Sequence, residues 1–516
     1  MYKIGIDVGG TNTDAVLCSR DHTILAEVKR PTTQDVYSGI LDALHTVLAE
    51  SGVSPGEISQ AMLGTTQCTN AIVERKNLAP FAVLRIGAPA TTGIPPMADW
   101  DDALRAHCVA QEIVGGGFEY DGRLLAEFDR EACRRFLESV RGRAEALAVS
   151  CVFSTVRNDH ELAAREMARE ILGPDVPVSL SSEIGSLGLI ERENATILNA
   201  ALHRVAQRFT TGFSESLRKE GITGAEIYLS QNDGTLMSLS SAERYPILTI
   251  ACGPTNSIRG AGWLSGCRDA VIIDAGGTTT DLGVIRKGFP RESGTVSYIG
   301  GIRTNFRMPD ILSVGLGGGS IVRTAPDGSI TVGPDSVGYA ITEKALVFGG
   351  DTLTASDIAV RLGMAKMGDP ALVSHIDLDF ARRAMDVIRT TAEDALDAMK
   401  TSGGDVDVIL VGGGSVIFPG TLAGAGTVTR PDHFGVANAI GSAISKVSGT
   451  CEGLFDYNTV GRDAALAEAR QKAVEGAVQA GARPDSVEIV DVEEVPLAYH
   501  PGNTSRIKVK AAGDLA

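Results

Sequence analysis

The sequence predicts an α/β protein in which two similar lobes face each other across a cleft. Short apolar, β-branched runs alternate with longer helical patterns along the chain, as in layered proteins with a largely parallel sheet. A motif of strand, glycine turn and second strand begins the chain and recurs near its middle. At 516 residues the chain is also too long for one hydrophobic core, which favours several domains.

The elements follow in order from these patterns. The β-branched apolar runs predict strands at 2–7, 15–18, 81–85, 146–153, 226–229, 270–274, 283–286 and 406–411. Apolar residues at helical spacing predict helices at 36–51, 72–75, 130–143, 161–172, 191–220, 357–362, 379–400 and 462–480. Further strands are expected near 487–492 and 506–510.

A glycine turn at 221–224 ends the long helix that begins at 191, and a new α/β set starts after it. We therefore expect a first lobe at 1–190 and a second lobe at 191–449. Residues 450–516 are expected to form a small C-terminal α/β appendage, or a strand added to a neighbouring sheet.

Composition narrows the class of protein. The formal net charge of −17 argues against a broad binding surface for nucleic acid or an anionic membrane. The first residues are already strand-like, and no apolar stretch is long enough to span a bilayer. Eight scattered cysteines without a C-x-x-C pair predict reduced thiols. A cytoplasmic location is expected.

The repeated motif is D-x-G-G-T-x-T-D, at 7–14 and again at 274–281. Adjacent glycines let a backbone approach a phosphate closely, and successive N–H groups there form an anion-binding hollow. The predicted nucleotide contacts are Gly9, Gly10, Thr11, Asn12 and Thr13 in the first loop, and Gly276, Gly277, Thr278 and Thr279 in the second. Asp7 and Asp274 end their strands, where each carboxylate is expected to hold a hydrated Mg²⁺ and to be essential for catalysis.

Two more glycine clusters follow apolar residues. Gly412, Gly413 and Gly414 end a predicted strand, and such a flat backbone can pack on the adenine or the ribose of a nucleotide. Gly317–Gly319 is either a second nucleotide contact or a flexible connection.

Three other groups of residues have both a functional and a structural interpretation. Thr65, Thr66 and Asn70 are predicted to bind a substrate amide or the second face of the phosphate cleft, although Thr69 or Asn70 would also cap a helix start. Glu191 is predicted to act in catalysis or to position water, but an acid at a helix start is favoured by the helix dipole in any case. Asn438 lies among small residues, which favours close helix packing.

The two loops with the later glycine turn resemble the phosphate-1, phosphate-2 and adenosine elements of the actin, hexokinase and heat-shock ATPase superfamily, whose lobes are actin-like (ribonuclease H-like). More narrowly, the chain resembles the hydantoinase A/5-oxoprolinase family. The segments that carry this resemblance are 64–75, 191–192, 196–200, 253–254, 274–281, 315–320, 496–499 and 501–502, so it covers most of the chain.

The resemblance implies an ATP- and Mg²⁺-dependent hydrolase of a cyclic amide such as 5-oxoproline, a hydantoin or a lactam. It implies activation of the carbonyl by phosphorylation in the cleft between the lobes. A second, hydantoinase B-type subunit or a homo-oligomer is the expected assembly. Two alternatives stay open: a small-metabolite kinase of the same superfamily, and a non-catalytic or regulatory ATPase.

Overall fold

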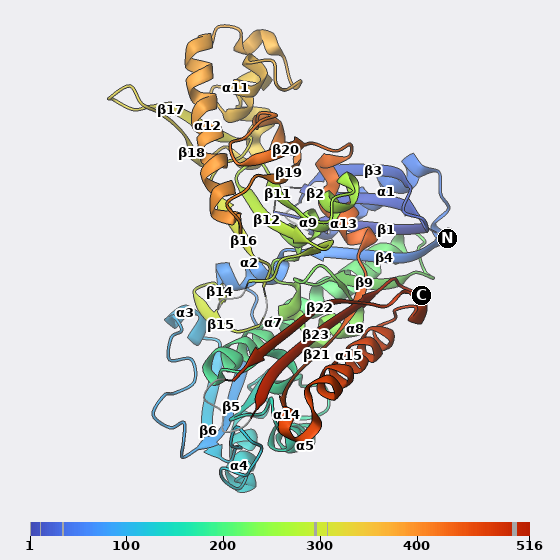
Figure 1. The fold of residues 1–516 in the computed structure, drawn as a ribbon, viewed down its shortest axis with the longest axis vertical. Helices are drawn as coiled ribbons and strands as arrows, with labels where there is room; N and C mark the ends of the chain where they lie inside the picture. Colours follow the sequence, from blue (N-terminus) through green and yellow to red (C-terminus); the bar gives the residue numbers. More distant parts are fainter. Residues whose placement is uncertain (1, 11, 34–35, 294–296, 307, 498–502) are drawn as a thin grey trace.

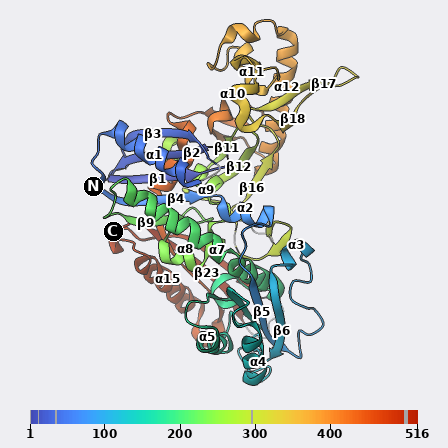
Figure 2. The same cartoon turned by 180° about the vertical axis from the view of Figure 1, so that it is seen from behind.

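The computed structural model describes residues 2–10, 12–33, 36–293, 297–306, 308–497 and 503–516. The molecule is elongated. A nine-stranded sheet lies between a second lobe at one end and a small α/β domain at the other, and the two chain termini lie close together (Figures 1 and 2). No helix of the described residues has both the length and the apolar surface needed to cross a membrane.

The nine-stranded sheet forms the first lobe. Its order is β22 (Glu488–Pro496), β23 (Thr504–Gly513), β21 (Val447–Asp456), β10 (Leu236–Ser238), β9 (Glu226–Ser230), β4 (Ile58–Thr65), β1 (Tyr2–Val8), β2 (Asn12–Ser19) and β3 (Ile24–Pro31). Alternate apolar residues of β1, β2 and β4 pack against α1 (Val36–Ser51) and α7 (Leu189–Lys219) in one core, as expected of a sheet covered by amphipathic helices.

The second lobe repeats this plan on a smaller sheet. The order is β13 (Phe289–Pro290), β12 (Thr280–Arg286), β11 (Ala270–Ala275), β19 (Val406–Val411) and β20 (Ala425–Thr429), and β16 (Ile311–Val314) also pairs with β12. In each lobe the first two strands form an antiparallel hairpin, and the first strand also pairs in parallel with a later one, β4 or β19. The repeat seen in the sequence is therefore a repeat of structure.

Helices α9 (Cys252–Ser265) and α13 (Ala437–Ile444) join the lobes by packing on each other. They touch at glycines: a Cβ on Gly260 would overlap the carbonyl of Ala437, and one on Gly441 would overlap that of Asn256. The prediction of close helix packing around Asn438 is thus confirmed for α13. This contact brings the first turns of both helices to the same place.

A four-stranded parallel sheet forms the small domain, in the order β6 (Cys108–Gly115), β5 (Phe81–Ala88), β7 (Ala146–Cys151) and β8 (Val178–Leu180). Helices α4 (Arg130–Val140) and α5 (Asp159–Leu172) pack on it around a separate core. The predicted lobes at 1–190 and 191–449 and the predicted C-terminal segment at 450–516 stay a proposal. The strand pairing itself places 226–238 and 447–513 in the sheet of β1.

The C-terminal segment follows the second of the two expected alternatives, because its strands extend an existing sheet. β21 pairs with β10 through Leu236 and Val447, and β23 lies between β21 and the edge strand β22. Helix α15 (Arg462–Gln479) covers β21 and β23 through a row of buried alanines. The sequence pattern predicted α15 and parts of β22 and β23 but not β21.

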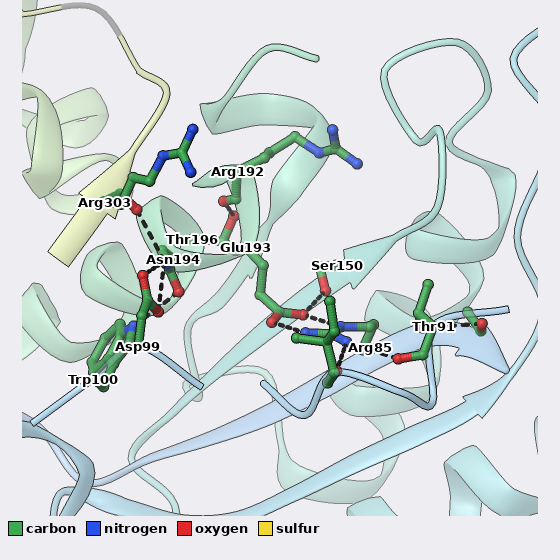
Figure 3. Close-up of polar contacts among 12 residues, drawn as sticks. Arg85, Thr91, Asp99, Trp100, Ser150, Arg192, Glu193, Asn194, Thr196 and Arg303 are labelled. Carbon is green, nitrogen blue, oxygen red and sulfur yellow. Dashed lines mark hydrogen bonds and ion pairs between the residues drawn. The ribbon is translucent and has the colours of Figure 1, made fainter. Parts of the chain in front are cut away.

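The small domain is tied to α7 by a buried ion pair (Figure 3). Arg85 on β5 donates two hydrogen bonds to Glu193 on α7, and the hydroxyl of Ser150 on β7 donates a third at 2.6 Å. Both charged side chains are at most 1% exposed. A buried pair of this kind is costly to break because either partner alone becomes an unpaired charge.

We therefore expect Glu193→Gln to lower the free energy of unfolding by about 3–5 kcal/mol, measured by denaturant unfolding of the full chain. The matched control is Arg204→Ala, which breaks the half-exposed pair with Glu145 and should cost less than about 1 kcal/mol. Equal losses of unfolding free energy in the two variants would contradict the prediction that the buried pair is the more costly one to break.

Candidate active site

A cavity of about 980 Å³ lies where the two hairpins face each other. It is lined by both glycine turns, by the first turns of α9 and α13, by the end of β3 and by residues 338–367 of the second lobe. The predicted residues among its lining are Asp7, Gly9, Gly10, Asn12, Thr66, Asp274, Gly276, Gly277, Thr279, Gly412, Gly413 and Gly414. The structure thus brings most of the predicted loop residues to one place.

The two hairpin turns are closed by equivalent hydrogen bonds. The N–H of Gly9 donates to the carbonyl of Asn12 at 2.9 Å, and the N–H of Gly276 donates to that of Thr279 at 2.9 Å. These bonds close the turns and leave the N–H groups of Gly10 and Gly277 for an anion. Behind each turn, acids pair across the strands, Asp7 with Asp14 and Asp274 with Asp281.

Asp7 is fixed by an asparagine from each of the two central helices. Asn256 of α9 donates to one carboxylate oxygen at 3.2 Å, and Asn438 of α13 donates to the other at 3.0 Å. Ser257, in the second turn of α9, lines the same cavity as Asp274. The sequence did not predict that these side chains support the acids. Only the small residues around Asn438 gave a signal, and that signal indicated helix packing.

Burial dominates the electrostatics of both acids. It raises the pKa of Asp7 to about 6, against the opposing hydrogen bond from Asn256, and the nearby Asp14 raises it further. Burial likewise raises the pKa of Asp274 to about 6, with added repulsion from Asp281 and Asp7. Two acids that repel each other in a buried site are relieved by a bound cation.

A glycine beside each acid leaves room for its carboxylate. Gly64 on β4 stands opposite Asp7 in the parallel pairing, and a Cβ there would overlap an Asp7 oxygen and the amide of Asn256. In the second lobe a Cβ on Gly412 would overlap an Asp274 oxygen. Glycine is also favoured at position 412 by the backbone conformation, because φ there is +81°.

The second turn is held between two other glycine segments. The N–H of Gly318 donates to the carbonyl of Gly276 at 3.0 Å, and the N–H of Gly319 donates to that of Gly277 at 2.7 Å. From the other side, Gly414 packs so closely that a Cβ would overlap the Gly276 carbonyl. Gly317–Gly319 is therefore a packed support of the turn and not a flexible connection, and Gly318 itself lines the cavity.

The cavity has a polar and an apolar end. Lys29 on β3 lies near the first turn and donates to both carboxylate oxygens of Asp14 at 2.8 Å. The second lobe contributes the apolar side chains of Ile341, Phe348 and Met367 to the lining, together with the backbone of Gly412–Gly414. An apolar wall of this kind suits the flat face of a nucleobase, and the polar end suits phosphates.

The other predicted residues lie elsewhere. Thr11 lies outside the described residues, as does the part of the family-like C-terminal segment at 498–502. Thr13 and Thr65 are buried, and Thr278 is exposed but outside the lining. Asn70 is an exposed residue within α2 (Gln67–Glu74), and the N-cap of that helix is Thr66. Glu191 forms an ion pair with Arg303 at 3.1 Å and does not line the cavity.

The residues fit a Mg²⁺ ion. No group of three or more His, Cys, Asp or Glu side chains that could hold a metal occurs among the described residues. Mg²⁺ does not need one, because it commonly binds through one or two carboxylates while waters and substrate phosphates complete its shell. Asp7, which is buried, and Asp274, which is partly exposed to the cavity, offer two carboxylates for that purpose.

We expect Mg²⁺ binding with nucleotide to weaken as pH falls below about 6. Each acid must lose its proton to bind the cation, so affinity should fall up to about tenfold per pH unit for each acid that titrates. Calorimetric titrations at pH 5, 6 and 7 measure this slope. Repeating them on Asp274→Asn cancels the protonation of the nucleotide itself, and an unchanged slope in that variant would contradict the assignment.

Two family models match the chain. One describes the N-terminal region of hydantoinase/oxoprolinase and matches residues 3–172, and the other describes hydantoinase/oxoprolinase and matches residues 192–402.

Among curated proteins, the chain is 26% identical to the caprolactamase subunit alpha of Pseudomonas jessenii, over 77% of this chain and 59% of that one. It is 28% identical to the acetophenone carboxylase gamma subunit of Aromatoleum aromaticum, over 70% of this chain and 53% of that one. The chain thus spans little more than half the length of these relatives.

Among solved structures, the ATP-dependent caprolactamase of Pseudomonas jessenii superposes with a TM-score of 0.78 at 19% identity, covering 100% of this chain and 88% of that one. This likeness confirms the predicted α/β fold class of paired lobes.

Proposed function

Because the chain belongs to the hydantoinase/oxoprolinase family, we propose that it is an enzyme that uses ATP and Mg²⁺ to phosphorylate the carbonyl oxygen of a cyclic amide. The observation that carries the proposal is the pair of matching acid-bearing glycine turns that face each other across one cavity. The apolar end at Phe348 and Met367 would take the base, and the turns would take the phosphates.

The chemistry that the chain supplies is positioning and charge stabilisation, which is what phosphoryl transfer needs. The free N–H groups of Gly10 and Gly277 would donate to phosphate oxygens. Mg²⁺, held by Asp7 and Asp274, would neutralise charge that develops on the transferring phosphoryl group. Asn256 and Asn438 keep the Asp7 carboxylate in one orientation.

The reaction balances with one ATP and two waters. The carbonyl oxygen bonds to the γ-phosphorus, the bond from that phosphorus to the β–γ bridging oxygen breaks, and ADP leaves. Water then adds to the ring carbon, the C–N bond breaks, and the nitrogen takes a proton. A second water releases phosphate and gives the ring-opened amino acid.

We also propose a second subunit as partner. The two curated relatives named above are themselves a subunit alpha and a subunit gamma, and this chain spans only part of their length. The hydrolytic steps would then be shared with the partner, while phosphorylation belongs to the cavity described above.

The test is ADP release by the full chain with Mg²⁺ and ATP, alone and with cyclic amides, ketones or sugars. Stimulation by cyclic amides is the expected result. Turnover stimulated by sugars instead would support a kinase of the same fold. Turnover indifferent to every small molecule would overturn the enzyme proposal in favour of a regulatory ATPase.

A further inference from the structure

The charges around the main cavity are strongly one-sided. Its lining holds the acids Asp7, Asp14, Asp274 and Asp281, whereas Lys29 is the sole basic side chain among the described lining residues. A carboxylate on the substrate would enter a site that is already negative, where an unpaired anion is costly. Bound Mg²⁺ offsets part of that charge but is shared with the phosphates of the nucleotide.

Lys29 has no donor left for a substrate carboxylate. An ammonium group has three N–H donors. Two of them point to the two oxygens of Asp14, and the third to the carbonyl of Gly435, each at 2.8 Å. The one cation among the described lining residues is therefore already paired within the protein.

Two hydroxyl groups of the lining, those of Thr32 and Thr66, are oriented to accept hydrogen bonds. Thr32 donates its hydroxyl proton to the carbonyl of Gly9 at 2.8 Å, and Thr66 donates its proton to that of Val8 at 3.3 Å. Each oxygen also receives one protein contact, Thr32 from Thr13 at 3.3 Å and Thr66 from Asn70 at 3.4 Å. A hydroxyl oxygen can accept twice, so each retains one lone pair for an N–H donor.

The first turn of α9 adds no charged side chain to this end. Gly253 and Pro254 line the cavity there, and Pro254 has no N–H to offer. Apart from the N–H groups of the two turns, which the phosphates would take, Thr32 and Thr66 thus present acceptors to whatever binds beside the phosphates.

We infer that the phosphoryl acceptor is an uncharged secondary cyclic amide, recognised through its ring N–H by the hydroxyl oxygens of Thr32 and Thr66. Substrates that bear a carboxylate, such as 5-oxoproline, are rejected. This inference rests on the proposed function and narrows its substrate class. It makes Thr32 and Thr66 specificity-determining residues of the site.

The experiment uses compounds that differ by one group. The compound 2-pyrrolidone differs from 5-oxoproline only by the carboxylate, and from N-methyl-2-pyrrolidone by the N–H. Calorimetric binding to the full chain with Mg²⁺ and a non-hydrolysable ATP analogue needs no turnover. We expect 2-pyrrolidone to bind at least about tenfold more tightly than either analogue, because a site built for an N–H leaves its acceptor unpaired without one. Hydantoin and hydantoin-5-acetic acid test the same contrast on a second ring.

Variants locate the preference in the named residues. Thr66→Val should remove most of the preference for the N–H compound, and Thr66→Ser should restore it. Thr32→Val is the second variant if the first fails to fold. Asp14→Asn removes one negative charge and loosens Lys29, so the affinity for 5-oxoproline relative to 2-pyrrolidone should rise by about tenfold.

The outcomes separate the inference from the proposed function. If 5-oxoproline binds as tightly as 2-pyrrolidone, or Thr66→Val keeps the preference for the N–H compound, the inference is wrong while the function stands. If no cyclic amide of either ring binds or stimulates ADP release, the proposed function fails as well.

Discussion

Asp274→Asn should lower ATP turnover by at least about 100-fold, and Asp7→Asn should do the same. Each change removes one carboxylate that is proposed to hold Mg²⁺, and a cation at a transferring phosphoryl group contributes several kcal/mol to the transition state. The lobes differ in sequence, yet the same acid stands at the same place in both hairpins. Similar losses are therefore expected from both variants.

The same variants should be as stable as the wild type, or more stable. The pKa of each acid is raised to about 6 in the fold, whereas in the unfolded chain the acid is already ionised at pH 5. The folded protein thus binds more protons between about pH 4 and 6, so its stability falls as pH rises through that window. An ionised buried acid costs on the order of 1–3 kcal/mol at neutral pH, and asparagine avoids that cost.

Thermal unfolding without Mg²⁺ and ADP release with Mg²⁺, measured on the same preparations, test both halves of this prediction. Asp405→Asn is the control, because Asp405 is exposed and far along the chain from either hairpin. If the variants keep wild-type turnover, the cavity is not the site of the reaction. Variants that lose activity only because they unfold would contradict the stability argument.

The predictable part of the site is the part encoded in a continuous segment. Both D-x-G-G-T-x-T-D segments could be recognised because strand, turn and second strand are consecutive, and the structure shows them as the paired hairpins. Asn256 and Asn438 reach Asp7 only because α9 and α13 pack closely at Gly260 and Gly441. That contact joins segments far apart in the chain, and no local pattern specifies its register.

The elements of the fold were likewise predictable only where a continuous segment has a clear pattern. Helix α1 was predicted with the bounds that the structure gives it, Val36–Ser51, and strand β19 likewise, Val406–Val411, because each has a clear period. Strand β21 was missed. Its two glycines, Gly449 and Gly453, and its alternating polar residues give a weak pattern. The strand is stabilised by its neighbours β10 and β23, since strand formation depends more on packing than on propensity.

The glycines beside the acids give the other large expected effect. Gly64→Ala places a methyl group against the Asp7 carboxylate and the Asn256 amide, and Gly412→Ala places one against Asp274 and the carbonyl of Ala275. Asp7 cannot swing aside without losing its hydrogen bonds to Asn256 and Asn438. Each variant should therefore displace its acid and reduce turnover by about 100-fold or more, with the larger loss of stability at Gly412, where an alanine is also strained at φ +81°.

The matched controls are Gly56→Ala and Gly420→Ala, because a Cβ at either position meets no atom within 4 Å. In both controls, the rate of ADP release and the free energy of unfolding by denaturant should stay close to the wild-type values. Raising Mg²⁺ should recover part of the lost turnover of Gly64→Ala, since a displaced carboxylate weakens the binding of the cation without removing its charge. If excess Mg²⁺ recovers nothing in that variant while the fold is intact, Gly64 serves the nucleotide or the substrate directly and not the position of Asp7.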